Sequence, residues 1–216
     1  MHRSVLLHEA IDALAIREGD TIVDATLGGA GHAREIAVRL GASGTFVGFD
    51  LDPDAIERAR IALSDSRPTV HLIESNFRNL GRELPAIGIE SIGGALFDLG
   101  WSSYQLDAGR GFSFLRDEPL LMTYGKEGGL TAQSIVNRWE EESLADVIYG
   151  WGEERYSRRI AKAIVDTRER KPFETALELA ETIKAAVPPV YRFGRIHPAT
   201  RTFQALRIAV NDEMGA

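Results

Sequence analysis

Apolar residues in the first hundred positions of the chain fall into short runs that are separated by segments with helical spacing. The runs that predict strands span residues 21–24, 45–50, 70–73 and 92–98. Helical spacing covers residues 32–40 after the first run, and 53–63 after the second, where Pro53 suits the first turn of a helix. Strands that alternate with helices predict right-handed βαβ units and therefore an α/β fold with a parallel sheet. Ligands bind such sheets at the carboxyl ends of the strands.

The pattern changes after Asp98. Residues 101–130 are typical of a loop, with an acidic turn at 116–119. From 131 to 186 the apolar spacing is helical, and two prolines at 188 and 189 end that stretch. The helices expected after the loop cover residues 140–149, 155–167, 175–186 and 198–213.

The composition is that of a globular protein. Apolar residues make up 44% of the chain and charged residues 26%, which excludes a disordered chain, a collagen and a coiled coil. No run approaches the roughly 18 apolar residues that a membrane span needs, and the apolar stretch near the N-terminus is too short for a signal peptide. The chain has no cysteine, which excludes disulfides, thiolate chemistry and cysteine metal sites. We therefore expect a cytoplasmic protein.

Charge is distributed unevenly along the chain, whose net charge is −7. Residues 155–207 hold 12 Lys and Arg against 5 Asp and Glu, whereas residues 1–154 hold 13 against 25. The total argues against a protein that binds nucleic acid regardless of sequence. This uneven charge fits a cationic small ligand bound by the acidic residues 1–154 and an anionic polymer bound by the basic residues 155–207.

A glycine-rich turn follows the predicted strand that ends at Asp24. Glycines at 28, 29 and 31 let the backbone approach a ligand, and the N-terminus of the next helix directs free N–H groups toward it. Asp50 ends the second strand, where a carboxylate can accept hydrogen bonds from ribose hydroxyls. Together these features favour an adenosine site, although tight turns and strand ends carry Gly and Asp in many proteins without ligands. The glycine spacing differs from G-x-G-x-x-G, which disfavours a dinucleotide.

Two further strand ends carry candidate ligand contacts. Asp98 ends the fourth strand, which neighbours the first in this fold class, so its carboxylate would face the same ligand. Asp98 or Ser102 could instead cap a helix. Phe77 follows the third strand, where an aromatic ring could lie against an adenine, and an ordinary core position is the alternative.

A stripe of basic residues marks the predicted helix 155–167. Its members, spaced i, i+3, i+4 and i+7, are Arg155, Arg158, Arg159 and Lys162. A solvated charged face is the usual explanation, but no acid interrupts the stripe and six more arginines follow between 168 and 207. Arginine forks suit phosphates, so we expect nucleic-acid contact here. His32, His71 and His197 are scattered without carboxylates at metal spacing, so no metal site is predicted.

Ten segments, spread along nearly the whole chain, follow the pattern of one family. They are residues 2–9, 24–32, 50–53, 98–100, 102–103, 105–107, 110–114, 152–155, 158–161 and the ungapped run 195–211. In these segments the sequence resembles the bacterial ribosomal RNA small-subunit methyltransferase H family, also called MraW.

The resemblance implies an S-adenosylmethionine-dependent methyltransferase that modifies N4 of a cytidine in the decoding region of 16S ribosomal RNA, within the small ribosomal subunit. Its fold would be a class I, Rossmann-like sheet with a helical insertion. Residues 1–107 would form the first part of the core, 108–195 the loop and RNA-recognising insertion, and 196–216 a return helix of the core. The cofactor-binding residues that it implies are Gly29, Ala30, Gly31, His32, Asp50, Phe77, Asp98 and Gln105.

Methyl transfer to N4 of cytosine needs assistance, because the lone pair of this amine is delocalised into the ring. Acceptors near N4 can attract its protons and stabilise the charge that grows in the transition state, and the candidates are Asp98 and the carbonyl of Leu99. The target base must leave its stack, and Trp101 or Tyr104 could stack on it. This chemistry requires no metal and no covalent nucleophile.

Two departures from the family pattern stand out. Residues 121–124, Leu-Met-Thr-Tyr, stand where the family has a Met-Arg-Met motif. Family members also continue past Asn211 with a further strand that completes the sheet. We therefore expect an unpaired edge on the fourth strand of residues 1–216, and a segment that alone is marginally stable, self-associates and binds cofactor poorly.

Three alternatives stay open. A nicotinamide-dependent oxidoreductase is disfavoured by the glycine spacing and by His32. A truncated relative could bind cofactor or ribosomal RNA without turnover. The same chemistry could act on a different target, such as cytosine in DNA.

Overall fold

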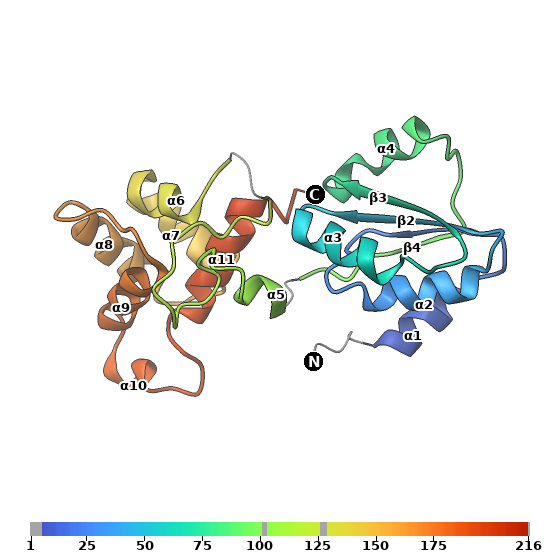
Figure 1. The fold of residues 1–216 in the computed structure, drawn as a ribbon. Helices are drawn as coiled ribbons and strands as arrows, with labels where there is room; N and C mark the ends of the chain where they lie inside the picture. The colour runs from blue at the N-terminus through green and yellow to red at the C-terminus, as the bar shows by residue number, and fades with distance from the viewer. Residues whose placement is uncertain (1–5, 101–102, 126–128, 216) are drawn as a thin grey trace. The chain divides into compact units, whose positions relative to one another are not determined.

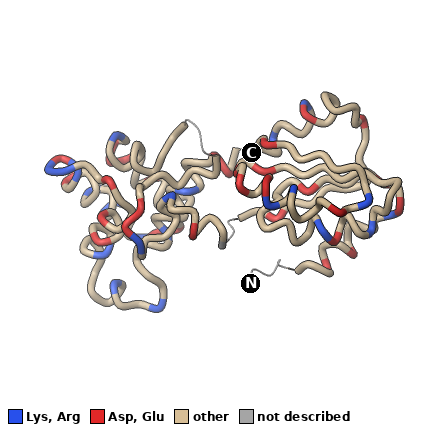
Figure 2. The backbone as a smooth tube through the Cα atoms, in the orientation of Figure 1, with Lys and Arg blue, Asp and Glu red and all other residues tan. Residues whose placement is uncertain are grey.

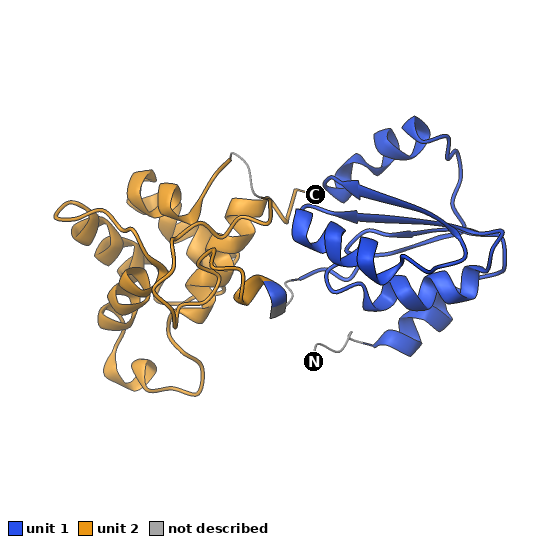
Figure 3. Ribbon diagram, viewed as in Figure 1, with its two compact units in different colours: residues 1–104, 216 blue, residues 105–215 orange. Residues whose placement is uncertain are grey.

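The computed structural model describes residues 6–100, 103–125 and 129–215. The chain divides into two compact units, and the boundary in the sequence lies between Tyr104 and Gln105 (Figure 3). The part up to Tyr104 is unit 1, and the part from Gln105 to Gly215 is unit 2.

Unit 1 is built on a parallel sheet. Its strands are β1 (Thr21–Asp24), β2 (Thr45–Asp50), β3 (Thr69–Glu74) and β4 (Gly94–Leu96), in the order β3-β2-β1-β4. The register places Asp24 of β1 opposite Gly48 of β2 on one side and opposite Leu96 of β4 on the other. The α/β fold and the adjacency of the first and fourth strands, both predicted from the sequence, are confirmed. In the described chain β4 forms one edge of the sheet.

β4 is shorter than the predicted run 92–98, and a hydrogen bond explains why. The N–H of Ala25 still donates to the carbonyl of Leu96, at 2.9 Å. The next donor along β4, the N–H of Asp98, turns to the hydroxyl of Thr26 at 2.8 Å instead of to a backbone carbonyl. Strand pairing therefore ends at Leu96, and Asp98 belongs to the turn region.

Helices cover both faces of this sheet (Figure 1). On one face, α1 (Leu7–Ala13), α2 (Gly31–Leu40) and α3 (Pro53–Ala62) pack on the strand residues Ile22 and Phe46. On the other face, α4 (Leu80–Ala86) packs on Val23, Val47 and Phe49. Neighbouring strand residues thus enter opposite cores, as the period of two in a strand requires. A short 3₁₀ helix, η1 (Phe77–Asn79), connects β3 to α4.

Unit 2 is helical. Its helices are α6 (Ala132–Arg138), α7 (Glu141–Gly150), α8 (Ser157–Arg168), α9 (Ala176–Ala186), α10 (Pro189–Arg192) and α11 (Thr200–Asn211), and α5 (Ser103–Leu106) crosses the boundary with unit 1. Two of the helices begin at capping boxes, in which Thr131 exchanges hydrogen bonds with Ser134 and Thr175 with Glu178.

The last helix belongs to unit 2 by its contacts. We expected residues 196–216 to form a return helix of the first domain, whereas the structure packs α11 on α6 and α7. The cause is the apolar face of α11, because Phe203 and Leu206 are buried in the same core as Ile135 and Leu144. The division in the sequence thus differs from the one expected, while the RNA-recognising role of this unit stays a prediction.

The segment 121–124, which departs from the family pattern, is tied to the end of α11. The side-chain amide of Asn211 donates to the carbonyl of Met122 at 2.8 Å, and its oxygen accepts from the N–H of Tyr124 at 2.8 Å. The hydroxyl of Tyr124 donates to Glu213 at 3.0 Å, and Met122 is buried. In this sequence, therefore, the segment has a structural role within unit 2. None of the helices in the described ranges is long and apolar enough to span a membrane.

Candidate functional site

Three carboxylates gather at the carboxyl edge of the sheet in unit 1, at the ends of adjacent strands. Asp24 ends β1, Asp50 ends β2 and Asp98 follows β4. Asp24 is almost completely buried, with 1% of its surface exposed. Its Oδ1 atom accepts from the N–H of Thr26 at 3.0 Å, whereas Oδ2 has no hydrogen-bond partner among the described residues. Burial raises the pKa of Asp24 from 3.8 to about 7, and the negative charges of Asp50 and Asp98 contribute to this rise.

Asp50 fixes the glycine-rich turn. Its Oδ2 atom accepts from the N–H of Gly28 and its Oδ1 atom from the N–H of Asp52, both at 2.9 Å. Burial raises the pKa of Asp50, and these two hydrogen bonds oppose that effect. Each oxygen keeps a further lone pair, so the carboxylate can still accept from a ligand.

The turn itself presents an open helix N-terminus. Gly28 has φ 48°, and Ala30, which caps α2, has φ 61°, a left-handed conformation that is strained for a residue with a side chain. Ala30, the residue that caps α2, has no side-chain acceptor for the first turn, so the start of the helix presents backbone N–H groups and the positive end of its dipole. Gly29 lies in the turn before Ala30, and Gly31 and His32 form the start of the helix.

The turn lies directly on β2 because Gly48 lacks a side chain. A Cβ atom at Gly48 would come within 2.5 Å of Cδ2 of Leu27, which is buried. The N–H of Leu27 also donates to the carbonyl of Phe49 at 3.1 Å. On the other side, the Nε atom of Arg58 donates to the carbonyl of Gly28 at 3.2 Å.

Asp98 is the exposed member of the three carboxylates. Its side chain is 48% exposed, and its Oδ2 atom lies 3.9 Å from Nδ1 of the buried His32. Thr26 connects it to Asp24, because the backbone of Thr26 donates to Asp24 and its hydroxyl accepts from the N–H of Asp98. The arrangement brings together a buried carboxyl, an open carboxylate and a helix N-terminus, and it can hold a ligand that carries both a cation and an anion.

The aromatic candidates have different surroundings. The half-buried ring of Phe77 meets Phe97 edge to face, with the ring centres 5.5 Å apart, and Phe97 is 45% exposed. The ring of Tyr104 lies 4.5 Å from the guanidinium carbon of Arg58, so one of its faces is already covered. Trp101 lies outside the described residues.

Several residues of this site were not singled out from the sequence. Asp24 and Thr26 lie in a segment that the resemblance includes, but burial of Asp24 and the bridging hydroxyl of Thr26 depend on the pairing of β1 with β4. No sequence pattern pointed to Phe97 or Arg58 as residues of the site. Gln105 was expected at the cofactor but falls in unit 2, so its role stays a prediction.

The prediction that the basic stripe forms one face of a helix is confirmed in part. Arg158 and Arg159 are exposed on α8, and Ile160 and Ile164 are buried on the opposite side. α8 begins only at Ser157, so Arg155 precedes the helix and lies over the rings of Tyr156 and Tyr191.

Ion pairs and hydrogen bonds to backbone carbonyls occupy several cationic side chains of unit 2. Lys162 pairs with Asp166 at 3.1 Å. Arg168 donates to the carbonyls of Val136 and Trp139, and Arg207 pairs with Glu213. Acidic and basic residues are both spread over the helices of this unit (Figure 2). RNA binding by the stripe therefore stays a prediction that rests mainly on Arg158 and Arg159.

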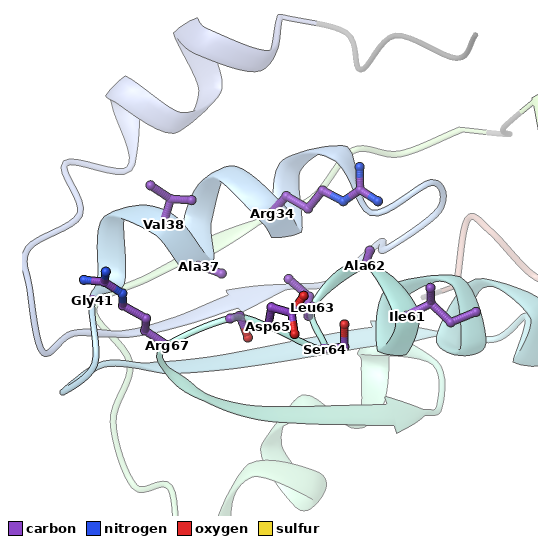
Figure 4. Close-up of a pocket in the computed structure, with 11 residues that line it drawn as sticks. Arg34, Ala37, Val38, Gly41, Ile61, Ala62, Leu63, Ser64, Asp65 and Arg67 are labelled. Atoms are coloured by element: carbon purple, nitrogen blue, oxygen red, sulfur yellow. The ribbon is translucent and has the colours of Figure 1, made fainter.

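A separate groove lies in unit 1 between α2 and residues 61–67 (Figure 4). Its lining includes Val38, Ile61 and Arg67 but none of the three carboxylates, so it is not part of the candidate site. In the ranges that the structure describes, no group of three His, Asp or Glu side chains is placed to hold a metal ion.

Comparison with known proteins identifies the family. The model of the MraW methylase family matches residues 1–216. Ribosomal RNA small subunit methyltransferase H of Paenibacillus sp. (strain JDR-2) is 48% identical over 222 residues, which cover 100% of this chain and 70% of that protein. The protein of the same name from Deinococcus radiodurans is 49% identical over 216 residues, which cover 100% of this chain and 66% of that protein. A crystal structure of a Clostridium thermocellum protein, assigned as an rRNA-methylase, is 28% identical with a TM-score of 0.39, over 47% of this chain and 54% of that chain. By the match along its whole length, this chain belongs to the MraW methylase family.

Proposed function

We propose that this chain transfers a methyl group from S-adenosylmethionine to N4 of a cytidine in the decoding region of 16S ribosomal RNA, in the cytoplasm. The family supports methyl transfer, and relatives that are 48% and 49% identical are named ribosomal RNA small subunit methyltransferase H. The observation that carries the proposal is the set of three carboxylates beside the open N-terminus of α2.

The residues of this edge fit S-adenosylmethionine. When bound, this cofactor supplies a methyl group on a positively charged sulfur. The unpartnered Oδ2 atom of Asp24 suits a cationic amine, since a cation would restore the hydrogen bond and charge balance that the buried carboxyl lacks. The first-turn N–H groups of α2 suit a carboxylate. Asp50 suits a ribose diol, and the half-buried ring of Phe77 suits the face of an adenine.

The full set proposed for the cofactor retains the residues that the family pattern indicates. They are Gly29, Ala30, Gly31, His32, Asp50, Phe77, Asp98 and Gln105, to which the structure adds Asp24.

Asp98 is the proposed catalytic residue. A carboxylate that is about half exposed can reach a substrate, and the bond from its own N–H to Thr26 fixes its backbone. There it accepts hydrogen bonds from the exocyclic amine, favours a pyramidal nitrogen and stabilises the charge that grows on it. The carbonyl of the exposed residue Leu99 is a second acceptor. Trp101 and Tyr104 are proposed to stack on the base, and Arg155, Arg158, Arg159 and Lys162 to contact the RNA backbone.

A methyl-transfer assay tests the proposal. The chain is incubated with tritiated S-adenosylmethionine and small ribosomal subunits that lack the modification, and the labelled nucleoside is identified by digestion and chromatography. We expect label in N4-methylcytidine. Binding of S-adenosylmethionine without any incorporation would favour the non-catalytic alternative, and label in another nucleoside would contradict the proposed target.

A further inference from the structure

The segment from residue 188 to residue 197, which contains α10 and joins α9 to α11, exposes three large apolar side chains. Val190 is 92% exposed, Phe193 81% and Ile196 57%. Burial of such side chains normally stabilises a protein, so a cluster of them in solvent does not serve folding. We call residues 188–197 the α10 segment.

The first half of the α10 segment is anchored firmly. The hydroxyl of Tyr191 donates to Oε2 of Glu154 at 2.5 Å, and Glu154 is completely buried. Burial and this neighbouring carboxylate raise the pKa of Tyr191 to about 12. The guanidinium of Arg155 lies 5.0 Å from the centre of the Tyr191 ring, and Arg192 donates to two carbonyls at the end of α9.

The second half is anchored as well. The ring of His197 stacks on Phe114 at 4.6 Å, and Phe114 meets Phe203 of α11 edge to face at 5.3 Å. Tyr191 and His197 thus hold the segment on either side of Phe193. The exposed apolar side chains are presented by a fixed frame rather than by a free loop, and a preformed surface loses little conformational entropy when a partner binds.

Along the sequence, the segment and its flanks carry charge of one sign, although in space the buried Glu154 binds Tyr191 and Glu181 acts on His197. No Asp or Glu occurs from residue 182 to residue 211, whereas five basic residues do. One of them, Arg195, is exposed between Phe193 and Ile196 and has no ion pair within the described part of the chain. A partner that lies on this surface therefore meets an aromatic ring beside an unneutralised guanidinium.

We infer that the α10 segment binds single-stranded RNA, with Phe193 stacked on a base and Arg195 on a neighbouring phosphate. Base stacking on an exposed aromatic is tolerant of sequence because every base has a π face, and a guanidinium fork matches a phosphate. An apolar protein surface would have to desolvate Arg195 without compensation, whereas a polyanion compensates it. The inference rests on the proposed function for the kind of substrate, but not on which base is methylated.

Binding of a fluorescein-labelled single-stranded RNA of mixed sequence, followed by fluorescence anisotropy on the full chain, tests the inference. We expect Phe193→Ala to weaken affinity about tenfold, since the ring that stacks on a base is removed. Tyr149→Ala is the matched control, because Tyr149 is a 66% exposed aromatic on α7 of the same unit, and its affinity should equal that of the unaltered chain. Arg195→Ala should lower the slope of log affinity against log salt by about 0.7.

Two bulky substitutions separate stacking from a structural role. Phe193→Trp should keep the affinity, whereas Phe193→Leu, which is apolar but has no π face, should bind as weakly as Phe193→Ala. Equal affinity of Phe193→Ala and Tyr149→Ala would overturn the inference. So would a Phe193→Ala variant that binds RNA normally but is no longer retained on small ribosomal subunits, because the partner would then be a protein.

The outcomes also separate this inference from the proposed function. RNA binding that depends on Phe193, without methyl transfer, would support the inference and refute the proposed function. Normal methyl transfer by Phe193→Ala, with unchanged KM for RNA and unchanged affinity, would overturn the inference alone.

Discussion

The carboxyl edge of the sheet in unit 1 and the outer face of α8 in unit 2 both carry charged residues. The two regions differ in how far these residues are buried and in whether they are paired. At the sheet edge, Asp24 is buried with an oxygen that has no partner in the described ranges, and Ala30 is strained. On α8, Lys162 is exposed and paired with Asp166. A buried group without a partner is costly and marks a place where a ligand can offset that cost, whereas exposed pairs contribute little to stability. Local energetic cost, rather than charge density, distinguishes the site from the surface.

Asp98→Asn gives the largest expected effect at the sheet edge. We expect turnover to fall about a thousandfold, because the carboxylate acts on charge that appears only in the transition state. Affinity for S-adenosylmethionine, measured by calorimetry, should stay within about tenfold. If binding and turnover fell equally, Asp98 would be a cofactor ligand and not a catalytic residue.

Asp24→Asn should remove a pH dependence of stability at the sheet edge. The pKa of Asp24 in the folded chain, about 7, lies above its ordinary value of 3.8. The stability that the neutral carboxyl contributes is therefore complete below pH 3.8 and is lost as the pH rises through 7, with a total of a few kcal/mol. Urea unfolding of both chains between pH 4 and 8 measures the difference.

The same titration should appear in cofactor binding. A bound cation favours the ionised form of Asp24, so affinity for S-adenosylmethionine should weaken as the pH falls below about 7 in the unaltered chain and not in Asp24→Asn. Parallel pH profiles for the two chains would show that Asp24 does not touch the cofactor.

The triple variant Arg158→Ala, Arg159→Ala and Lys162→Ala tests the surface of α8. Each of these three side chains that contacts a phosphate of single-stranded RNA contributes to the salt dependence of binding. Removing one such contact should lower the slope of log affinity against log salt by about 0.7. Lys171→Ala is the control, since Lys171 is an exposed lysine of unit 2 that pairs with Glu178. A slope equal to that of the control would make the stripe an ordinary solvated face.

Lys162→Ala alone should have the smallest effect. Because Lys162 is exposed and its charge is already paired with Asp166 at i+4, we expect almost no loss of stability in urea unfolding and little change in RNA affinity. A large decrease in RNA affinity in this variant would show that the ion pair opens to bind phosphate.

The parts of the molecule that follow from local patterns were predictable from the sequence. Apolar runs predicted the positions of β1, β2 and β3 within one residue, and Asp50 and Asp98 follow from the ends of strands. Two features depend on contacts between distant residues and could not be predicted. β4 stops at Leu96 because Asp98 turns to Thr26, and Asp24 is buried because strands lie on both sides of it.

The helical unit shows the same limit. The sequence placed the start of α8 at Arg155, two residues before its observed start at Ser157. A spacing pattern cannot show that Glu154, just before the predicted start, is buried and bound to Tyr191. α4 was missed since it is short and contains Pro85, which ordinarily disfavours a helix. Local propensity thus described the elements, while tertiary contacts decided their ends.

The close approach of Leu27 to Gly48 limits which sequences can maintain the turn at the carboxyl edge. Any side chain at position 48 would displace Leu27, which precedes Gly28, and through it the amide that Asp50 holds. A selection for active variants should therefore disfavour large side chains at Gly48, even though Gly48 has no functional group to offer a ligand.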